Sequence, residues 1–170
     1  MNQQQVLTDT ARRTQQLLQN RHGIDLEILN NGVADPVPQP KNGIDHLRLR
    51  LLPDMRPRRP RRFWDPKWCF YEIGVGQYPK PGLAKVQFFM AGNNARCGNG
   101  FHNQRVNDIL AAVARKRSDA HHRPIAGRGT YGWLDIYYAV PDPAKMAADL
   151  AWIVTETFHK FISLPDAPPQ

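Results

Sequence analysis

The chain has 170 residues and a formal net charge of +8, and hydrophobic residues make up 41% of it. This length suits one domain, and no apolar run approaches the roughly 18 residues that a membrane span needs. Two cysteines are too few for a disulfide scaffold or a four-cysteine zinc site. We therefore expect a soluble, single-domain, cytoplasmic protein with no cofactor and no membrane as its partner.

The first part of the chain predicts one helix followed by irregular structure. Residues 4–22 carry a thin apolar stripe at helical spacing, and Gly23 is a typical residue at which such a helix ends. Residues 24–29 fit a short strand. The segment 30–44 holds three prolines and two glycines, which favours a loop.

A strand with clean alternation is predicted around residues 47–51. Its leucines alternate with Arg48 and Arg50, so the two arginines share the opposite side of the strand. We expect that side to be an exposed face of a sheet.

Residues 68–75 and 83–90 also alternate, and the connector GQYPKPG predicts that they form a hairpin. Glu72 and Lys85 lie on faces of this hairpin that coincide if the register allows it. The simplest interpretation of the two residues is a cross-strand ion pair.

The second half predicts a helix, a strand and a final helix. A glycine- and asparagine-rich loop, 92–100, leads into a helix at about 102–117, and a basic loop that contains glycine follows it. A strand is predicted at 131–140. Asp142 then caps the last helix, which has Pro143 at its first position and a strong apolar stripe.

Together these elements predict a single α+β domain at residues 1–165 and a disordered tail at 166–170. Strands that are neighbours in sequence often pair, so we expect a mostly antiparallel sheet of about four to five strands. Three helices should cover it, in the order α-(β)-β-β-β-α-β-α, with a basic Arg/Pro loop at 53–66. The oligomeric state stays open.

The positive charge is concentrated in two segments. Residues 45–67 contain eight basic and three acidic residues, and residues 115–128 contain five basic and one acidic residue. The rest of the chain has a net charge of −1. Such clustering indicates a basic patch for an anionic partner rather than a uniformly basic surface.

The sharpest feature is a run of five arginines within residues 56–62. Its two prolines favour an extended arm that suits a phosphate backbone or an acidic groove. Phe63, Trp64 and Trp68 follow, and aromatic rings beside arginine are common where single strands bind. The alternative is a solvated loop whose aromatic residues anchor it to the core.

Our first hypothesis is a non-enzymatic nucleic-acid-binding domain. Its contacts would come from both basic segments and the adjacent tryptophans: Arg48, Arg50, Arg56, Arg58, Arg59, Arg61, Arg62, Trp64, Trp68, Arg115, Lys116, Arg117, Arg123 and Arg128. The alternative is a protein-interaction module, such as an adaptor, an inhibitor or a chaperone-like protein, that docks an acidic protein partner. A metal-dependent nuclease is the third hypothesis.

Catalytic and metal chemistry finds little support, so we do not favour an enzyme and predict no catalytic or metal-binding residue. The only serines, Ser118 and Ser163, have no plausible base nearby. Cys69 suits a strand core, whereas Cys97 lies in the glycine-rich loop. The four candidate zinc ligands match no established spacing: Cys97, His102, His121 and His122.

A nuclease needs clustered carboxylates. The strand carboxylates here are Asp45, Glu72 and Asp135, but no Asp/Glu-x-Lys triplet occurs on a predicted strand.

One predicted strand has two faces that are both apolar enough to be buried. Tyr131, Trp133, Asp135 and Tyr137 share one of them. If that face points outward, it is an aromatic surface suited to bases or to a protein partner. If helices cover it, it is core, and periodicity cannot choose between the two.

Overall fold

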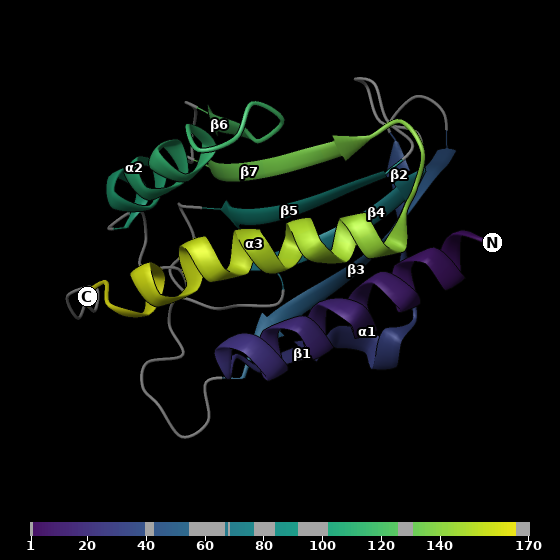
Figure 1. The fold of residues 1–170 in the computed structure, drawn as a ribbon. Coiled ribbons are helices and arrows are strands. Elements are labelled where there is room, and N and C mark those ends of the chain that lie inside the picture. Colours follow the sequence, from purple (N-terminus) through teal and green to yellow (C-terminus); the bar gives the residue numbers. More distant parts are fainter. Residues whose placement is uncertain are drawn as a thin grey trace.

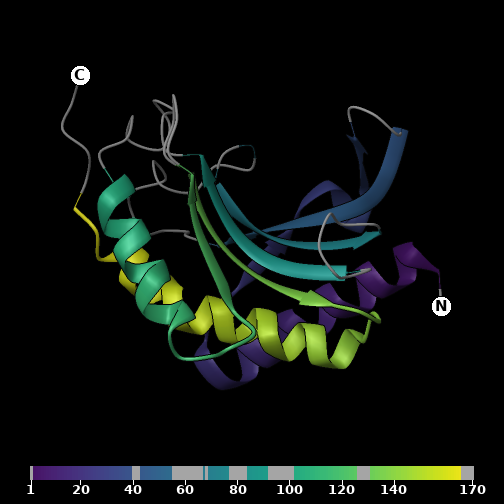
Figure 2. The ribbon, with the colours of Figure 1, turned by 90° about the horizontal axis from the view of Figure 1, so that it is seen from above.

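Helices lie on one side of a curved antiparallel sheet, as Figures 1 and 2 show. The computed structural model describes residues 2–39, 43–54, 67, 69–76, 84–91, 102–125 and 131–165. Its helices are α1 (Gln3–His22), the 3₁₀ turn η1 (Leu29–Gly32), α2 (Asn103–Ala114) and α3 (Pro143–Ile162). The predicted α+β class, with three helices over a mostly antiparallel sheet, is confirmed.

The sheet has seven strands in the part of the chain that is described, more than the four to five predicted. They are β1 (Leu26–Ile28), β2 (Asp35–Gln39), β3 (Gly43–Pro53), β4 (Cys69–Gly76), β5 (Ala84–Ala91), β6 (His121–Ile125) and β7 (Tyr131–Tyr138). Their order is β1-β3-β4-β5-β7-β6, and β2 also pairs with β3. Every pairing is antiparallel.

Strand β2 corrects the loop predicted at residues 30–44. Pro36 lies opposite Leu47, and β2 pairs with β3 alone. Proline is tolerated on such an edge strand because the N–H that it lacks need not join a ladder.

Strand β6 is the second correction, because the segment after α2 was expected to be a loop. It is short and polar, and it pairs only with β7. Helix α2 also ends at Ala114, three residues before the predicted end. No local pattern in the sequence marks β6 or the end of α2. Whether a polar pentapeptide becomes a strand depends on its pairing with a neighbouring strand.

The core lies between the helices and one face of the sheet. The helix-facing side chains of the central strands are fully or nearly fully buried: Leu49, Leu51, Tyr71, Ile73, Val86, Phe88, Leu134 and Ile136. The Tyr71 hydroxyl lies 2.8 Å from Oγ1 of Thr157 on α3, and the rings of Phe88 and Phe161 are 4.7 Å apart. No helix in the described ranges is long and apolar enough to cross a membrane.

Helix α1 ends and helix α3 begins where the sequence predicts. Gly23 follows α1 with a φ of 62°, a left-handed conformation that favours glycine. Asp142 caps α3, its Oδ1 accepting from the amides of Ala144 and Lys145, and Pro143 is the first helical residue.

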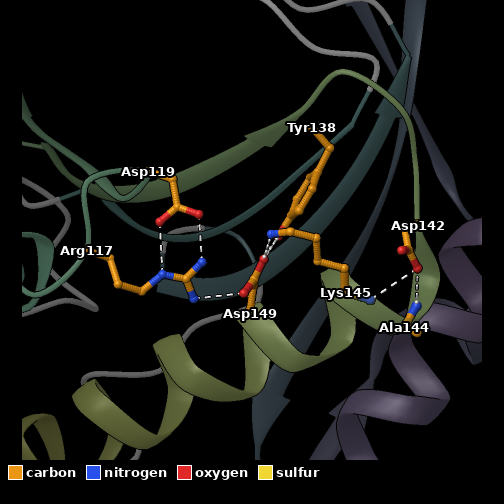
Figure 3. Close-up of polar contacts among 7 residues, drawn as sticks. All are labelled: Arg117, Asp119, Tyr138, Asp142, Ala144, Lys145 and Asp149. Atoms are coloured by element: carbon orange, nitrogen blue, oxygen red, sulfur yellow. Dashed lines mark hydrogen bonds and ion pairs between the residues drawn. The ribbon is translucent and has the colours of Figure 1, made fainter.

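A polar cluster centred on Asp149 joins α3 to β7 and to the connection before β6 (Figure 3). The Asp149 carboxylate accepts from Arg117 Nη1 at 2.7 Å, from the Tyr138 hydroxyl at 2.7 Å and from Lys145 Nζ at 2.9 Å. Arg117 also donates twice to Asp119. Burial opposes ionisation of Asp149, but these donors outweigh it and lower its pKa.

We expect Asp149→Asn to lower the free energy of unfolding at pH 7 by about 1–3 kcal/mol, because Arg117 and Lys145 lose a charged acceptor at a buried site. Arg117 also lowers the pKa of Asp119. A carboxyl group with a lowered folded-state pKa stabilises the fold above its unfolded pKa of about 3.9 and loses that contribution as the pH falls through the folded value.

The wild-type chain should therefore lose stability more steeply than the variant between about pH 4 and pH 2. Urea unfolding at several pH values checks this, with Asp108→Asn on the exposed side of α2 as the control. Identical pH slopes for the wild-type chain and Asp149→Asn would contradict the assignment.

Candidate anion-binding face

The sheet face opposite the helices, which we call the helix-free face because no helix of the described residues covers it, carries rows of side chains that cross several strands. Antiparallel partners in register lie side by side, so each row follows directly from the pairing. The polar row contains Arg50, Glu72, Gln87, Asp135 and His121. The basic row contains Arg48, Gly74, Lys85 and Tyr137. The aromatic row contains Phe70, Phe89 and Trp133, and Arg123 ends it.

Glu72 lies at the centre of a cationic cluster. Its side chain is only 3% exposed, and its Oε2 lies 3.7 Å from Arg48 Nη1 and 4.0 Å from Arg50 Nε. Its Oε1 lies 3.8 Å from Lys85 Nζ. Three cations thus converge on one carboxylate, and the charges of Asp35 and Asp135 act on Arg50 and Lys85 in addition.

Gln87 completes the contacts of this cluster. Its Nε2 donates to Glu72 Oε1 at 2.7 Å, and its Oε1 accepts from Lys85 Nζ at 2.8 Å. Lys85 lies directly opposite Gly74, so its contact with Glu72 is diagonal rather than directly across the pair. The predicted proximity of Glu72 and Lys85 is thus observed, within a larger group than one ion pair.

The cluster has unused hydrogen-bonding capacity. Glu72 Oε2 and Arg48 Nε are buried, and neither makes a hydrogen bond. Burial lowers the pKa of Lys85. Burial and the charge of Arg48 both lower the pKa of Arg50. The carboxylate of Glu72 opposes the shift at each residue. Cations in a largely buried site are stabilised by nearby negative charge, so this group suits a negatively charged ligand.

Arg48 and Arg50 are less accessible than the alternation predicts. Their side chains are 27% and 18% exposed, because each approaches Glu72 and the guanidinium of Arg50 stacks 4.5 Å from the centre of the Phe70 ring. The expected exposed face is therefore half-buried at this point.

A second charged group lies around Asp135, which is 1% exposed. Arg123 Nη2 lies 2.6 Å from Asp135 Oδ2, and Arg123 also hydrogen-bonds to the Tyr137 hydroxyl. The Arg123 guanidinium packs 5.5 Å from the centre of the Trp133 ring. Burial by itself would lower the pKa of Arg123, but the Asp135 carboxylate raises it above its usual value. Its side chain is still 47% exposed, so one flank can contact a ligand.

The aromatic row lies beside both charged groups. Ring centres are 5.1 Å apart between Phe70 and Phe89 and 5.7 Å apart between Phe89 and Trp133. Phe70 is buried, whereas Phe89 and Trp133 are half-buried. The structure thus decides that the Trp133 face of β7 is the one without helices, while Leu134 and Tyr138 face the core.

The predicted basic residues fall into three groups. Arg48, Arg50 and Arg123 share the helix-free face. Lys116 and Arg117 point instead toward α3, where Lys116 pairs with Glu156 and Arg117 with Asp149, and Arg115 is exposed at the end of α2. The other proposed contacts lie outside the described residues: Arg56, Arg58, Arg59, Arg61, Arg62, Trp64, Trp68 and Arg128.

The strand ends next to the segments 55–66, 92–101 and 126–130 lie at one end of the sheet. Pro53 ends β3 and Cys69 begins β4, at the level of Met90 near the end of β5. Tyr131 pairs with Ala91 and with Ile125 at that same end. The connections from β3 to β4 and from β6 to β7 therefore join strand ends that lie beside the aromatic row, whereas Lys116 and Arg117 of the second basic segment lie against α3.

In the part of the chain that the structure describes, no arrangement of side chains suits a metal ion. No group of three or more His, Cys, Asp or Glu side chains there could hold a metal ion. Glu72 and Asp135 each face cations instead. The Asn107 amide nitrogen donates to the Asn103 carbonyl, so the Asn107 Oδ1 is left to accept from His122 Nε2 at 2.8 Å. Burial lowers the pKa of His122. Cys97 lies outside the described residues, whereas Cys69 is buried.

Sequence reasoning did not assign Lys85, Gln87, Asp135 or Tyr137 to the site. Alternation did place Lys85 and Gln87 opposite the apolar side of their strand. Only the register of four paired strands brings them beside Arg48 and Arg50.

We expect Glu72→Gln to destabilise the fold by about 2–4 kcal/mol, because it leaves three cations around a neutral amide. Adding Lys85→Met should restore part of the loss, so the two changes should couple by at least about 0.5 kcal/mol. Urea unfolding of both single variants and the double variant measures this coupling. Glu27→Gln on the exposed side of β1 is the control, and additive effects would contradict the cluster.

Comparison with known proteins gives no relative: no protein-family model, curated protein or solved structure matches this chain.

Proposed function

We propose that this protein binds single-stranded nucleic acid on the helix-free face, without catalysing a reaction. The observation that carries the proposal is the convergence of Arg48, Arg50 and Lys85 on Glu72, beside the aromatic row. A phosphate oxygen would supply negative charge to this group of cations and an acceptor for Arg48 Nε, which makes no hydrogen bond.

The aromatic row supports a single strand in preference to a duplex. Phe89 and Trp133 are half-buried beside the cationic cluster, and Arg123 stacks against Trp133. Unpaired bases can stack on such rings, whereas bases within a duplex cannot reach them.

The strand ends beside two arginine-containing connections also support the proposal. The arginine-rich segment 55–66 joins β3 to β4, and the segment 126–130 joins β6 to β7. The strand ends that these two segments join flank the aromatic row.

The test compares two double variants that remove the same charge. Arg48→Gln with Lys85→Met alters the cluster, whereas Arg12→Gln with Arg13→Gln alters exposed residues of α1. Fluorescence anisotropy with a labelled single-stranded oligonucleotide, titrated with salt, measures affinity. The first variant should lose about tenfold in affinity at physiological salt, and its log–log salt slope should fall by about 1.4 for two lost phosphate contacts.

Circular dichroism and urea unfolding of both double variants serve as the control for folding. Equal losses for the two variants would mean general charge attraction and would contradict the proposed site. A lane with magnesium, checked for cleavage, tests the nuclease hypothesis at the same time.

We further expect a duplex of the same length to bind more weakly than the single strand, because paired bases cannot stack on Trp133 or Phe89. Competition of each oligonucleotide against the labelled strand measures the difference. A duplex that competes equally well, or heparin that competes as well as either, would contradict recognition by stacking and favour an acidic protein as the partner.

A further inference from the structure

A groove runs along the outer edge of β6, beside the C-terminal end of α2. Its volume is about 870 Å³, and Ala111 and Ala114 of α2 line one side. The edge of β6 from His121 to Arg123 lines it too, together with Tyr137. Figures 1 and 2 show that β6 and α2 lie next to each other at this margin of the sheet.

We infer that this groove binds an extended acidic segment of a partner protein, which adds to β6 as a further strand. The site is separate from the Glu72 cluster, and the inference does not depend on the proposed binding of nucleic acid.

The backbone of β6 provides the first argument. β6 is the last strand in the order of the sheet and pairs only with β7, so the polar groups along its other edge have no strand partner among the described residues. Such an edge is a template for an added strand. Pro124 has no N–H, which confines the new pairing to His121–Arg123. The short side chains of Ala111 and Ala114 leave room for the side chains of a peptide.

The charge of the groove provides the second argument. Arg115 is exposed on its rim, and no ion pair of Arg115 is found among the described residues. Asp119, the one acidic residue of the lining, already accepts two hydrogen bonds from Arg117. Arg123 also lines the groove and is 47% exposed, although its charge is paired with Asp135. The groove therefore complements acidic side chains.

The same features disfavour the other occupants. Pairing β6 with β6 of a second copy would bring Arg123 of both chains close together, and like charges near each other across strands are destabilising. A nucleic acid has no alternating N–H and C=O groups to match the strand edge.

The test uses a fluorescent decapeptide of alternating glutamate and threonine, with two matched probes. One probe is N-methylated at alternate residues, which removes the donors that strand addition needs. The other has lysine in place of glutamate. We expect the acidic peptide to bind, each matched probe to bind at least about tenfold more weakly, and the β6 amides to shift and exchange more slowly on binding.

The variants separate the groove from general charge. Arg115→Glu, which reverses the rim charge, and Ala111→Leu, which narrows the groove with a good helix former, should each weaken the acidic peptide by at least about fivefold. Arg13→Glu on α1 has the same charge change and should not.

Four results would overturn the inference: no binding of the acidic peptide, equal binding of the N-methylated probe, a concentration-dependent dimer that Arg115→Glu dissolves, or an Arg115→Glu variant that weakens an oligonucleotide and not the peptide. The last result would assign the groove to the nucleic-acid site. If the protein binds the acidic peptide but no oligonucleotide, the proposed nucleic-acid function is wrong and the peptide groove stands. The two proposals can therefore be tested separately.

Discussion

Continuous antiparallel pairing of β3, β4, β5 and β7 is the constraint on which the rest of this structure depends. Successive side chains on a strand point to opposite faces, and the unbroken register keeps each face uniform from strand to strand. One face is apolar and packs beneath α1, α2 and α3. The other collects charged, amide and aromatic side chains into rows. A shift of one residue in any strand would place charges such as Glu72 in the core.

The charged face is organised around buried carboxylates rather than around its arginines. Glu72 and Asp135 are almost inaccessible. Glu72 lies among three cations that would otherwise repel one another, and Asp135 pairs with Arg123. Burying such groups costs free energy that ion pairing only partly returns.

Formal charge along the sequence is a poor guide to which cations are available to a partner. The run Arg115–Arg117 looks uniformly basic, yet its members have different surroundings. Lys116 and Arg117 face the carboxylates of Glu156 and Asp149 on α3, while Arg115 faces solvent beside the β6 groove. The acidic residues of the C-terminal helix therefore neutralise part of the second basic segment, because the fold brings them to it.

The sequence by itself determined the elements whose side chains repeat with a clear period. The apolar stripes of α1 and α3, the cap at Asp142, the alternation that puts Arg48 and Arg50 together and the β4–β5 hairpin are all local patterns. β2 and β6 were missed because prolines and polar residues become strands there only through pairing with β3 and β7. The tertiary structure alone decided which face of β7 the helices cover, since both faces are apolar enough to be buried. It also decided that Lys85, Gln87 and Asp135 join the arginines, because residues far apart in sequence meet only when the strand register is set.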